Sequence, residues 1–122
     1  MSMQRDSSRI VDMLTAAHAI LRYMSGVSQD DFVQQDMLQD AVIRQVTIIG
    51  EAASQISAEF RAAHPDIPWL EVVGMRHRLV HGYGQVSLAT VWKTIQVDVP
   101  QLITCLDEFT HDHFTRGEAP SN

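Results

Sequence analysis

Apolar residues recur three and four positions apart over most of this 122-residue chain, and that spacing restricts the fold more than any other feature. A repeat near 3.6 residues places apolar side chains on one face of a helix, whereas a strand needs a repeat of two. Two long faces of this kind comprise Ile10, Leu14, Ala17, Leu21 and Met24, and then Leu38, Val42, Val46, Ile49, Ala53, Ile56 and Phe60. The sequence therefore predicts an all-α fold.

Helix-breaking and helix-capping residues divide the first half of this pattern. Gly26 is expected to end the first helix, and Ser28 or Asp36 to begin the second. The apolar spacing carries the second helix through Phe60, and the prolines of the segment 64–68 end it.

A third helix is expected from Trp69 to about His81, closed by Gly82 and Gly84. The fourth begins at the cap Ser87 and runs to Phe109. Proline removes a backbone N–H, so Pro100 should kink or split this last helix, with Asp98 as a possible new cap. The expected architecture is an up-and-down bundle of four to five helices.

Length and composition predict one helical domain over residues 1–114, with residues 115–122 as a disordered tail. A hydrophobic content of 45% is enough for one core. The formal net charge of −6 argues against a broad basic surface that coats nucleic acid, so any RNA contact must be a local basic site. With one cysteine, no apolar run of membrane-spanning length and no signal-peptide pattern, we expect a cytoplasmic protein without membrane attachment.

The segment from Arg76 to Tyr83 carries the densest group of chemically active side chains. If a helix covered it, His77 and His81 would share a face, Arg76 and Tyr83 would nearly do so, and the helix dipole would favour the imidazolium form of His81. Arginine binds phosphate oxygens and histidine transfers protons, so the group suits phosphodiester chemistry.

Two other interpretations fit the same residues. Basic side chains near a helix C-terminus are favourable through the dipole alone, and Gly82 is an ordinary cap. The i, i+4 pair His77 and His81 also has the spacing of zinc ligands, but Arg78 stands where a glutamate would follow the first histidine. We therefore predict no metal site and no cofactor.

The spacing Arg76-x4-His81-x-Tyr83 resembles the RX4HXY motif of the HepT-like toxins, which belong to the HEPN superfamily of mostly metal-independent ribonucleases. The resemblance covers nearly the whole chain. Its further segments are Asp40-Ala41-Val42, Ile49-Gly50-Glu51-Ala52, Ile67-Pro68-Trp69, Gly74-Met75-Arg76, Leu79-Val80-His81-Gly82-Tyr83, Val91-Trp92 and Asp98-Val99-Pro100.

The resemblance implies a HEPN-like homodimer that brings two motifs together and cleaves RNA, with tRNA among the substrate types. It further implies a nucleotidyltransferase antitoxin of the MntA type that transfers AMP from ATP to the motif tyrosine. Carried over to this chain, Arg76 and His81 become catalytic and Tyr83 becomes the AMPylated residue. The fold and function expected are thus those of a metal-independent endoribonuclease toxin.

Two supporting residues keep open roles. His77 stands where the family usually has asparagine, and it either adds proton-transfer capacity or fills space. Gly50 inside a helix costs about 1 kcal/mol relative to alanine, which indicates that a backbone or ligand approaches closely there. Glu51 beside it either orients Arg76 or His81 or is a partly exposed surface residue.

Two other functional classes were weighed against the ribonuclease. The first is a non-catalytic HEPN subunit that binds a nucleotidyltransferase; the intact set Arg76, His81 and Tyr83 favours the enzyme. The second is a nucleotide-binding domain, and the sequence has no glycine-rich phosphate loop of the required spacing.

Overall fold

The computed structural model describes residues 2–80 and 85–113 of the chain, with side chains described for residues 5–80 and 85–109. The described backbone is helical throughout its regular parts, apart from one antiparallel bridge between Val80 and Val86, so the predicted all-α fold is confirmed. In chain order the helices are α1 (Ser2–Met24), α2 (Gln29–Val33), α3 (Asp36–Ser54), α4 (Ala58–Ala63), α5 (Trp69–Val73), α6 (Met75–Arg78), α7 (Leu88–Lys93), a π-helical turn η2 (Thr94–Asp98) and α8 (Val99–His113).

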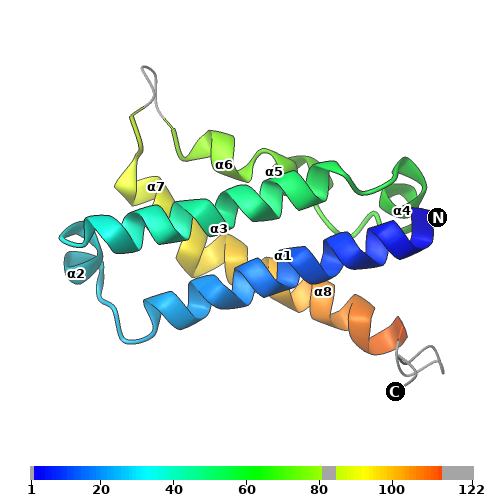
Figure 1. The fold of residues 1–122 in the computed structure, drawn as a ribbon, viewed down its shortest axis with the longest axis horizontal. Coiled ribbons are helices and arrows are strands. Elements are labelled where there is room, and N and C mark those ends of the chain that lie inside the picture. Colours follow the sequence, from blue (N-terminus) through cyan, green and yellow to red (C-terminus); the bar gives the residue numbers. More distant parts are fainter. Residues whose placement is uncertain (1, 81–84, 114–122) are drawn as a thin grey trace.

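The first two apolar patterns become α1 and α3, which pack antiparallel along their length (Figure 1). Gly26 follows α1 with a φ of 74°, a conformation that glycine adopts without strain, so the expected end of the first helix is confirmed. Fully buried side chains from α1 and α3, with others from the later helices, form one core: Ile10, Met13, Ile20, Val42, Val46, Ile49, Leu79, Val91, Val99 and Leu106.

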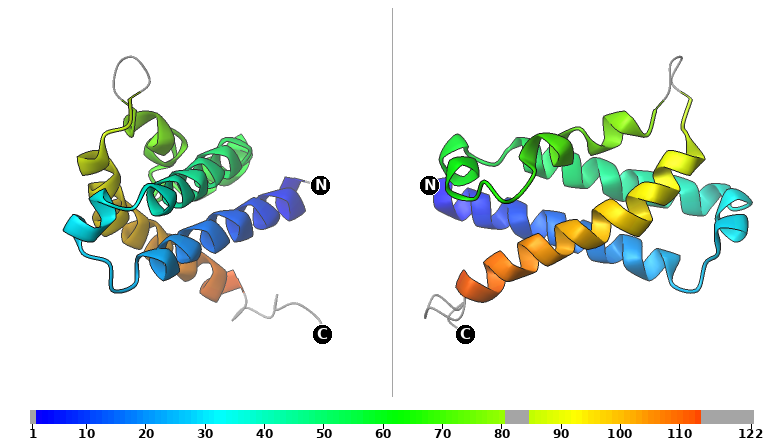
Figure 2. Two further views of the ribbon diagram at one scale, coloured as in Figure 1. Left: turned by 60° about the vertical axis from the view of Figure 1, so that its left-hand side comes forward. Right: turned by 180° about the vertical axis from the view of Figure 1, so that it is seen from behind.

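The consecutive elements α7, η2 and α8 cross behind the α1–α3 pair (Figure 2). The proline ring clashes with the carbonyl group four residues earlier, and for Pro100 that residue is Gln96, inside the π-helical turn η2. Instead of the expected kink or split at Pro100, the described helix stays continuous and contains a π-helical turn. The expected new cap at Asp98 is wrong, because α8 continues directly from η2 without a fresh start.

The second helix ends earlier than its apolar spacing indicates. α3 stops at Ser54, and Ser57 begins the separate helix α4, its Oγ accepting a hydrogen bond from the Phe60 amide at 3.1 Å. The buried carboxylate of Asp6 accepts bonds from the Ser57 amide (2.9 Å) and hydroxyl (2.7 Å). This link between the start of α1 and the start of α4 turns the chain away from α3.

Among the residues that the structure describes, no helix is both long enough and apolar enough to cross a membrane.

Candidate active site

The segment that carries the motif arginine is a broken helix. One helix was expected from Trp69 to about His81, but α5 and α6 are separated at Gly74, and α6 ends at Arg78 with Leu79 as its C-cap. Val80 then pairs with Val86, and the Ser87 amide donates to the Leu79 carbonyl at 2.8 Å. The expectation of a helix through Val80 is wrong, because the backbone there already pairs with the returning chain.

The other two motif residues, His81 and Tyr83, lie outside the described residues. Because α6 ends at Arg78, helical spacing no longer places His77 with His81 or Arg76 with Tyr83. The expected effect of a helix dipole on His81 lacks its helix for the same reason. The two chain ends that flank residues 81–84 are fixed nonetheless, since Val80 and Val86 are bridged.

The motif segment is held against α3 through a glycine. A Cβ atom on Gly50 would lie 3.2 Å from the carbonyl oxygen of Val73, the last residue of α5. A Cβ atom at this position would require a slight shift of α5, and a larger side chain would push α5 away from α3. The expectation that another backbone approaches Gly50 closely is confirmed, and the contact fixes where α6 begins relative to α3.

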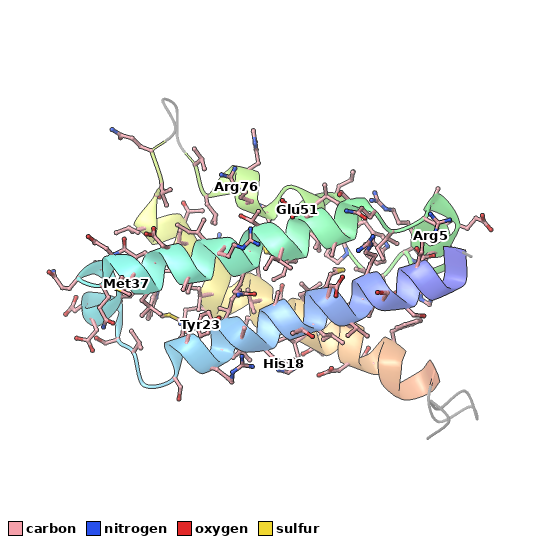
Figure 3. The ribbon with its side chains drawn as sticks, in the orientation of Figure 1. Arg5, His18, Tyr23, Met37, Glu51 and Arg76 are labelled. Atoms are coloured by element: carbon pink, nitrogen blue, oxygen red, sulfur yellow. The ribbon has the colours of Figure 1, made fainter. Side chains whose placement is uncertain are left out.

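Three of the predicted site residues are described, and all three side chains are exposed. Arg76 and His77 lie on α6, and Glu51 lies on the adjacent part of α3 (Figure 3). No hydrogen bond or ion pair joins Glu51 to Arg76 within residues 5–80 and 85–109. The structure thus brings Glu51 into the neighbourhood of α6, while its proposed role of orienting Arg76 stays a prediction.

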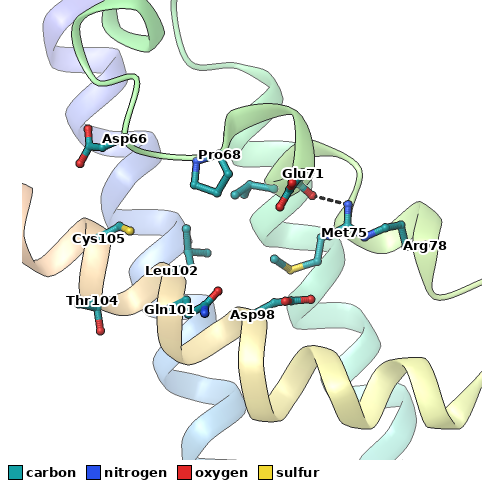
Figure 4. A pocket seen from close by; sticks show the side chains of 11 residues that line it. Asp66, Pro68, Glu71, Met75, Arg78, Asp98, Gln101, Leu102, Thr104 and Cys105 are labelled. Atoms are coloured by element: carbon teal, nitrogen blue, oxygen red, sulfur yellow. Dashed lines mark hydrogen bonds between the residues drawn. The ribbon is translucent and has the colours of Figure 1, made fainter.

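Arg78, two residues after Arg76, belongs to a different site. Its Nη1 donates to the Glu71 carbonyl at 2.8 Å, and the side chain borders a pocket of about 400 Å³ between α5–α6 and α8 (Figure 4). Met75 lines the same pocket, so this side of α6 faces α8. At about 100° per residue, Arg76 does not share the side of α6 that Met75 and Arg78 turn toward the pocket.

The charges around this pocket make it a poor place for a phosphate group. Three carboxylate residues line it, Asp66, Glu71 and Asp98, against the single guanidinium of Arg78. Cys105 also lines it and is half-buried. Burial, with smaller contributions from the carboxylates of Asp66 and Glu108, raises the pKa of the Cys105 thiol, so this sulfur is not an activated nucleophile.

The described residues offer no group of three or more histidine, cysteine, aspartate or glutamate side chains arranged to hold a metal ion. Arg76 and His77, both exposed on α6, are accessible to an anionic substrate. Guanidinium and imidazole groups of this kind bind phosphate oxygens and transfer protons.

Comparison with known proteins identifies the family. The family model described as "Ribonuclease HepT-like" matches residues 13–109. A protein of Thermococcus cleftensis named "Probable ribonuclease HepT" is 38% identical over 91 residues, which cover 75% of this chain and 83% of the relative. No solved structure is significantly similar to the chain.

Two further relatives are named as RNases. One, from Methanocaldococcus jannaschii, is 34% identical over 93 residues, or 76% of this chain and 85% of the relative. The other, from Caldanaerobacter subterraneus, is 37% identical over 90 residues, or 74% and 80% of the two chains. By the family match and these relatives, the chain belongs to the HepT-like ribonuclease family of HEPN proteins.

Proposed function

We propose that this protein is a metal-independent endoribonuclease and the toxin of a toxin–antitoxin pair. The observation that carries the proposal is the position of Arg76, which is exposed on α6 without a carboxylate partner in the described part of a HepT-like chain. An unpaired guanidinium is free to bind a phosphodiester through two parallel hydrogen bonds.

The proposed reaction is an internal transfer at phosphorus. The 2′-oxygen of one nucleotide attacks the adjacent phosphorus, the bond from phosphorus to the 5′-oxygen breaks, and the products are a 2′,3′-cyclic phosphate and a 5′-hydroxyl. His81 takes the proton from the 2′-hydroxyl, and His81 of a second copy gives a proton to the leaving 5′-oxygen. Arg76 offsets the charge that develops on the phosphate oxygens, which makes a metal ion unnecessary.

The protein acts as a homodimer in this scheme, because each reaction needs both a proton acceptor and a proton donor. RNA, with tRNA as the first candidate, is the substrate. His77, exposed beside Arg76, is a supporting residue that contacts the same phosphate region, and Glu51 supports the site from α3.

A nucleotidyltransferase antitoxin of the MntA type regulates the proposed enzyme. It transfers AMP from ATP to the phenolic oxygen of Tyr83, with release of pyrophosphate. The added phosphate and nucleoside compete for Arg76 by charge and block the RNA by bulk. Tyr83→Phe should therefore escape the antitoxin, and mass spectrometry of the wild type should show one adenylyl group that this variant lacks.

The deciding experiment incubates the purified protein with total tRNA in EDTA and maps the ends of the fragments. Cleavage with cyclic phosphate ends is expected for the wild type, and its loss is expected in Arg76→Ala and in His81→Ala. Activity that disappears in EDTA, or that persists in His81→Ala, would overturn the mechanism. If the protein instead binds the nucleotidyltransferase, leaves RNA intact and does not arrest growth, it is a non-catalytic HEPN subunit.

A further inference from the structure

A second arginine lies beside the line of contact between α3 and α6, which we call the α3–α6 seam. The sequence patterns did not identify this residue. Arg44 is exposed on α3, seven residues before Glu51. Seven residues make nearly two full helical turns, so Arg44 and Glu51 project from the same strip of α3, about 10 Å apart along its axis.

The glycine contact places this strip relative to α5 and α6. Gly50 faces Val73, and Ile43, which lies seven residues before Gly50 on the same line along α3, is half-buried against the core. Arg44 directly follows Ile43, as Glu51 directly follows Gly50. Both charged residues therefore lie on the solvent-exposed side of α3, next to the line of residues that contacts α5 and α6.

The direction of the two segments decides which charged residue lies nearer the motif. α5 and α6 run antiparallel to α3, so the chain moves from Val73 toward Val80 while α3 is followed back toward its N-terminus (Figure 1). From Gly50 to Arg44 is about 9 Å along α3. From Val73 the chain continues in the same direction through α6 (Met75–Arg78). Arg44 is thus level with the end of α6, where the motif continues, whereas Glu51 is level with its beginning.

Arg44 is also available for a ligand. Asp40 lies one turn before it on α3, but no ion pair joins the two side chains in the described structure. On a protein of formal net charge −6, Arg44 and Arg76 form a pair of exposed and unneutralised guanidinium groups on either side of the α3–α6 seam. Such a pair attracts consecutive phosphates of one nucleic-acid strand.

We propose that Arg44 binds the RNA phosphate next to the scissile one and so directs the strand across the α3–α6 seam. This inference rests on the proposed ribonuclease function. Arg44 takes no part in the chemical step, so it affects substrate binding, and thereby KM, while kcat stays close to the wild-type value.

The test measures binding of a single-stranded RNA oligonucleotide with 2′-O-methyl groups, which lacks the attacking hydroxyl and is not cleaved. Fluorescence anisotropy is recorded from 50 to 300 mM KCl for the wild type, Arg44→Ala, Arg44→Lys and the control Arg22→Ala. Arg22 is exposed near the end of α1, away from α6. Circular dichroism checks that each variant has the wild-type melting temperature.

Arg44→Ala should weaken binding about tenfold or more at low salt, for all sequences alike, and reduce the slope of log Kd against log salt by about 0.7. Arg44→Lys should keep most of the slope because the charge remains, and Arg22→Ala should match the wild type. If Arg44→Ala matches Arg22→Ala while the wild type binds and cleaves RNA, the Arg44 inference is wrong. If the wild type neither binds nor cleaves RNA, the proposed function itself fails.

Discussion

Helix α3 and the segment α5–α6 pack against each other, yet they are built in different ways. α3 is 19 residues long and unbroken, with six residues buried along one side. α5 and α6 contain five and four residues, and Gly74 separates them. Isolated helices as short as these are unstable in water, so their order must come from packing. At Gly50 the backbone of α5 lies so near α3 that an added Cβ would be 3.2 Å from the Val73 carbonyl oxygen.

This difference indicates that α3 supports the site while α6 carries the motif arginine. On α3 the charged residues Arg44 and Glu51 project from a regular helix whose opposite side forms the core. On α6 buried and exposed side chains follow each other within four residues, since Met75 is buried while Arg76 and His77 are exposed. The motif segment is therefore positioned by α3 and contributes little stability of its own.

The largest expected effect tests whether the short segment belongs to the common core. Leu79 is fully buried directly after α6, and Leu79→Ala should lower the free energy of unfolding by about 2–5 kcal/mol through lost burial and a cavity. Urea denaturation measures this, with Ile49→Ala in α3 as the matched variant. A cost for Leu79→Ala far below that for Ile49→Ala would mean that the motif segment unfolds separately from α3.

The second prediction separates chemistry from stability. Arg76→Ala should reduce kcat roughly 10²–10³-fold, because a group that stabilises charge on the reacting phosphate is removed. The melting temperature should stay the same, since Arg76 is exposed and unpaired in the described structure. Arg22→Ala serves as the surface control. A fall in melting temperature that accounts for the lost activity would place Arg76 among the residues that hold the fold together.

The third prediction acts on the contact between the two regions. Gly50→Val should lower the free energy of unfolding by about 1–3 kcal/mol and also reduce activity, because the new side chain displaces α5–α6 from α3. Gly50→Ala should be much milder, since its Cβ contact of 3.2 Å needs only a small shift and alanine favours the helix by about 1 kcal/mol. Thermal melts and RNA cleavage measure both variants. Full activity in a stable Gly50→Val protein would show that this contact does not position the site.

The smallest expected effect concerns the return of the chain after the motif. The Ser87 side chain caps α7 by accepting from the Thr90 amide at 3.3 Å, and Ser87→Ala should cost about 1 kcal/mol. Ser28→Ala, which removes the cap of the neighbouring helix α2, should cost about as much. Of the two variants, Ser87→Ala should reduce RNA cleavage, because loss of the cap loosens the residue whose backbone amide is bonded to the Leu79 carbonyl. Equal loss of activity in both would contradict a positioning role.

The regular helices could be predicted from sequence, and the interrupted ones could not. Apolar spacing identified α1 and α3, because both bury one continuous face. It missed the stop at Ser54 and the break at Gly74, because these depend on partners distant in sequence or on local glycine geometry. The bond from Ser57 to Asp6, 51 residues earlier, leaves no local pattern.

The candidate site shows the same division. The motif spacing identified Arg76, and a glycine inside a helix correctly indicated a close backbone contact at Gly50. No sequence pattern identified Arg44, because its proximity to the motif depends on α6 running antiparallel to α3. The seven-residue spacing from Arg44 to Glu51 was visible in the sequence, but it acquired meaning only once Gly50 was placed against Val73.

The bond between Asp6 and Ser57 also bears on the order in which the chain folds. α1 and α3 are joined by residues 25–35, which include α2, so contacts near this connection close small loops, whereas Asp6 and Ser57 meet at the opposite, open end of the pair. We expect this bond to form after the folding transition state. In stopped-flow measurements, Asp6→Ala should then accelerate unfolding and leave the refolding rate near its wild-type value.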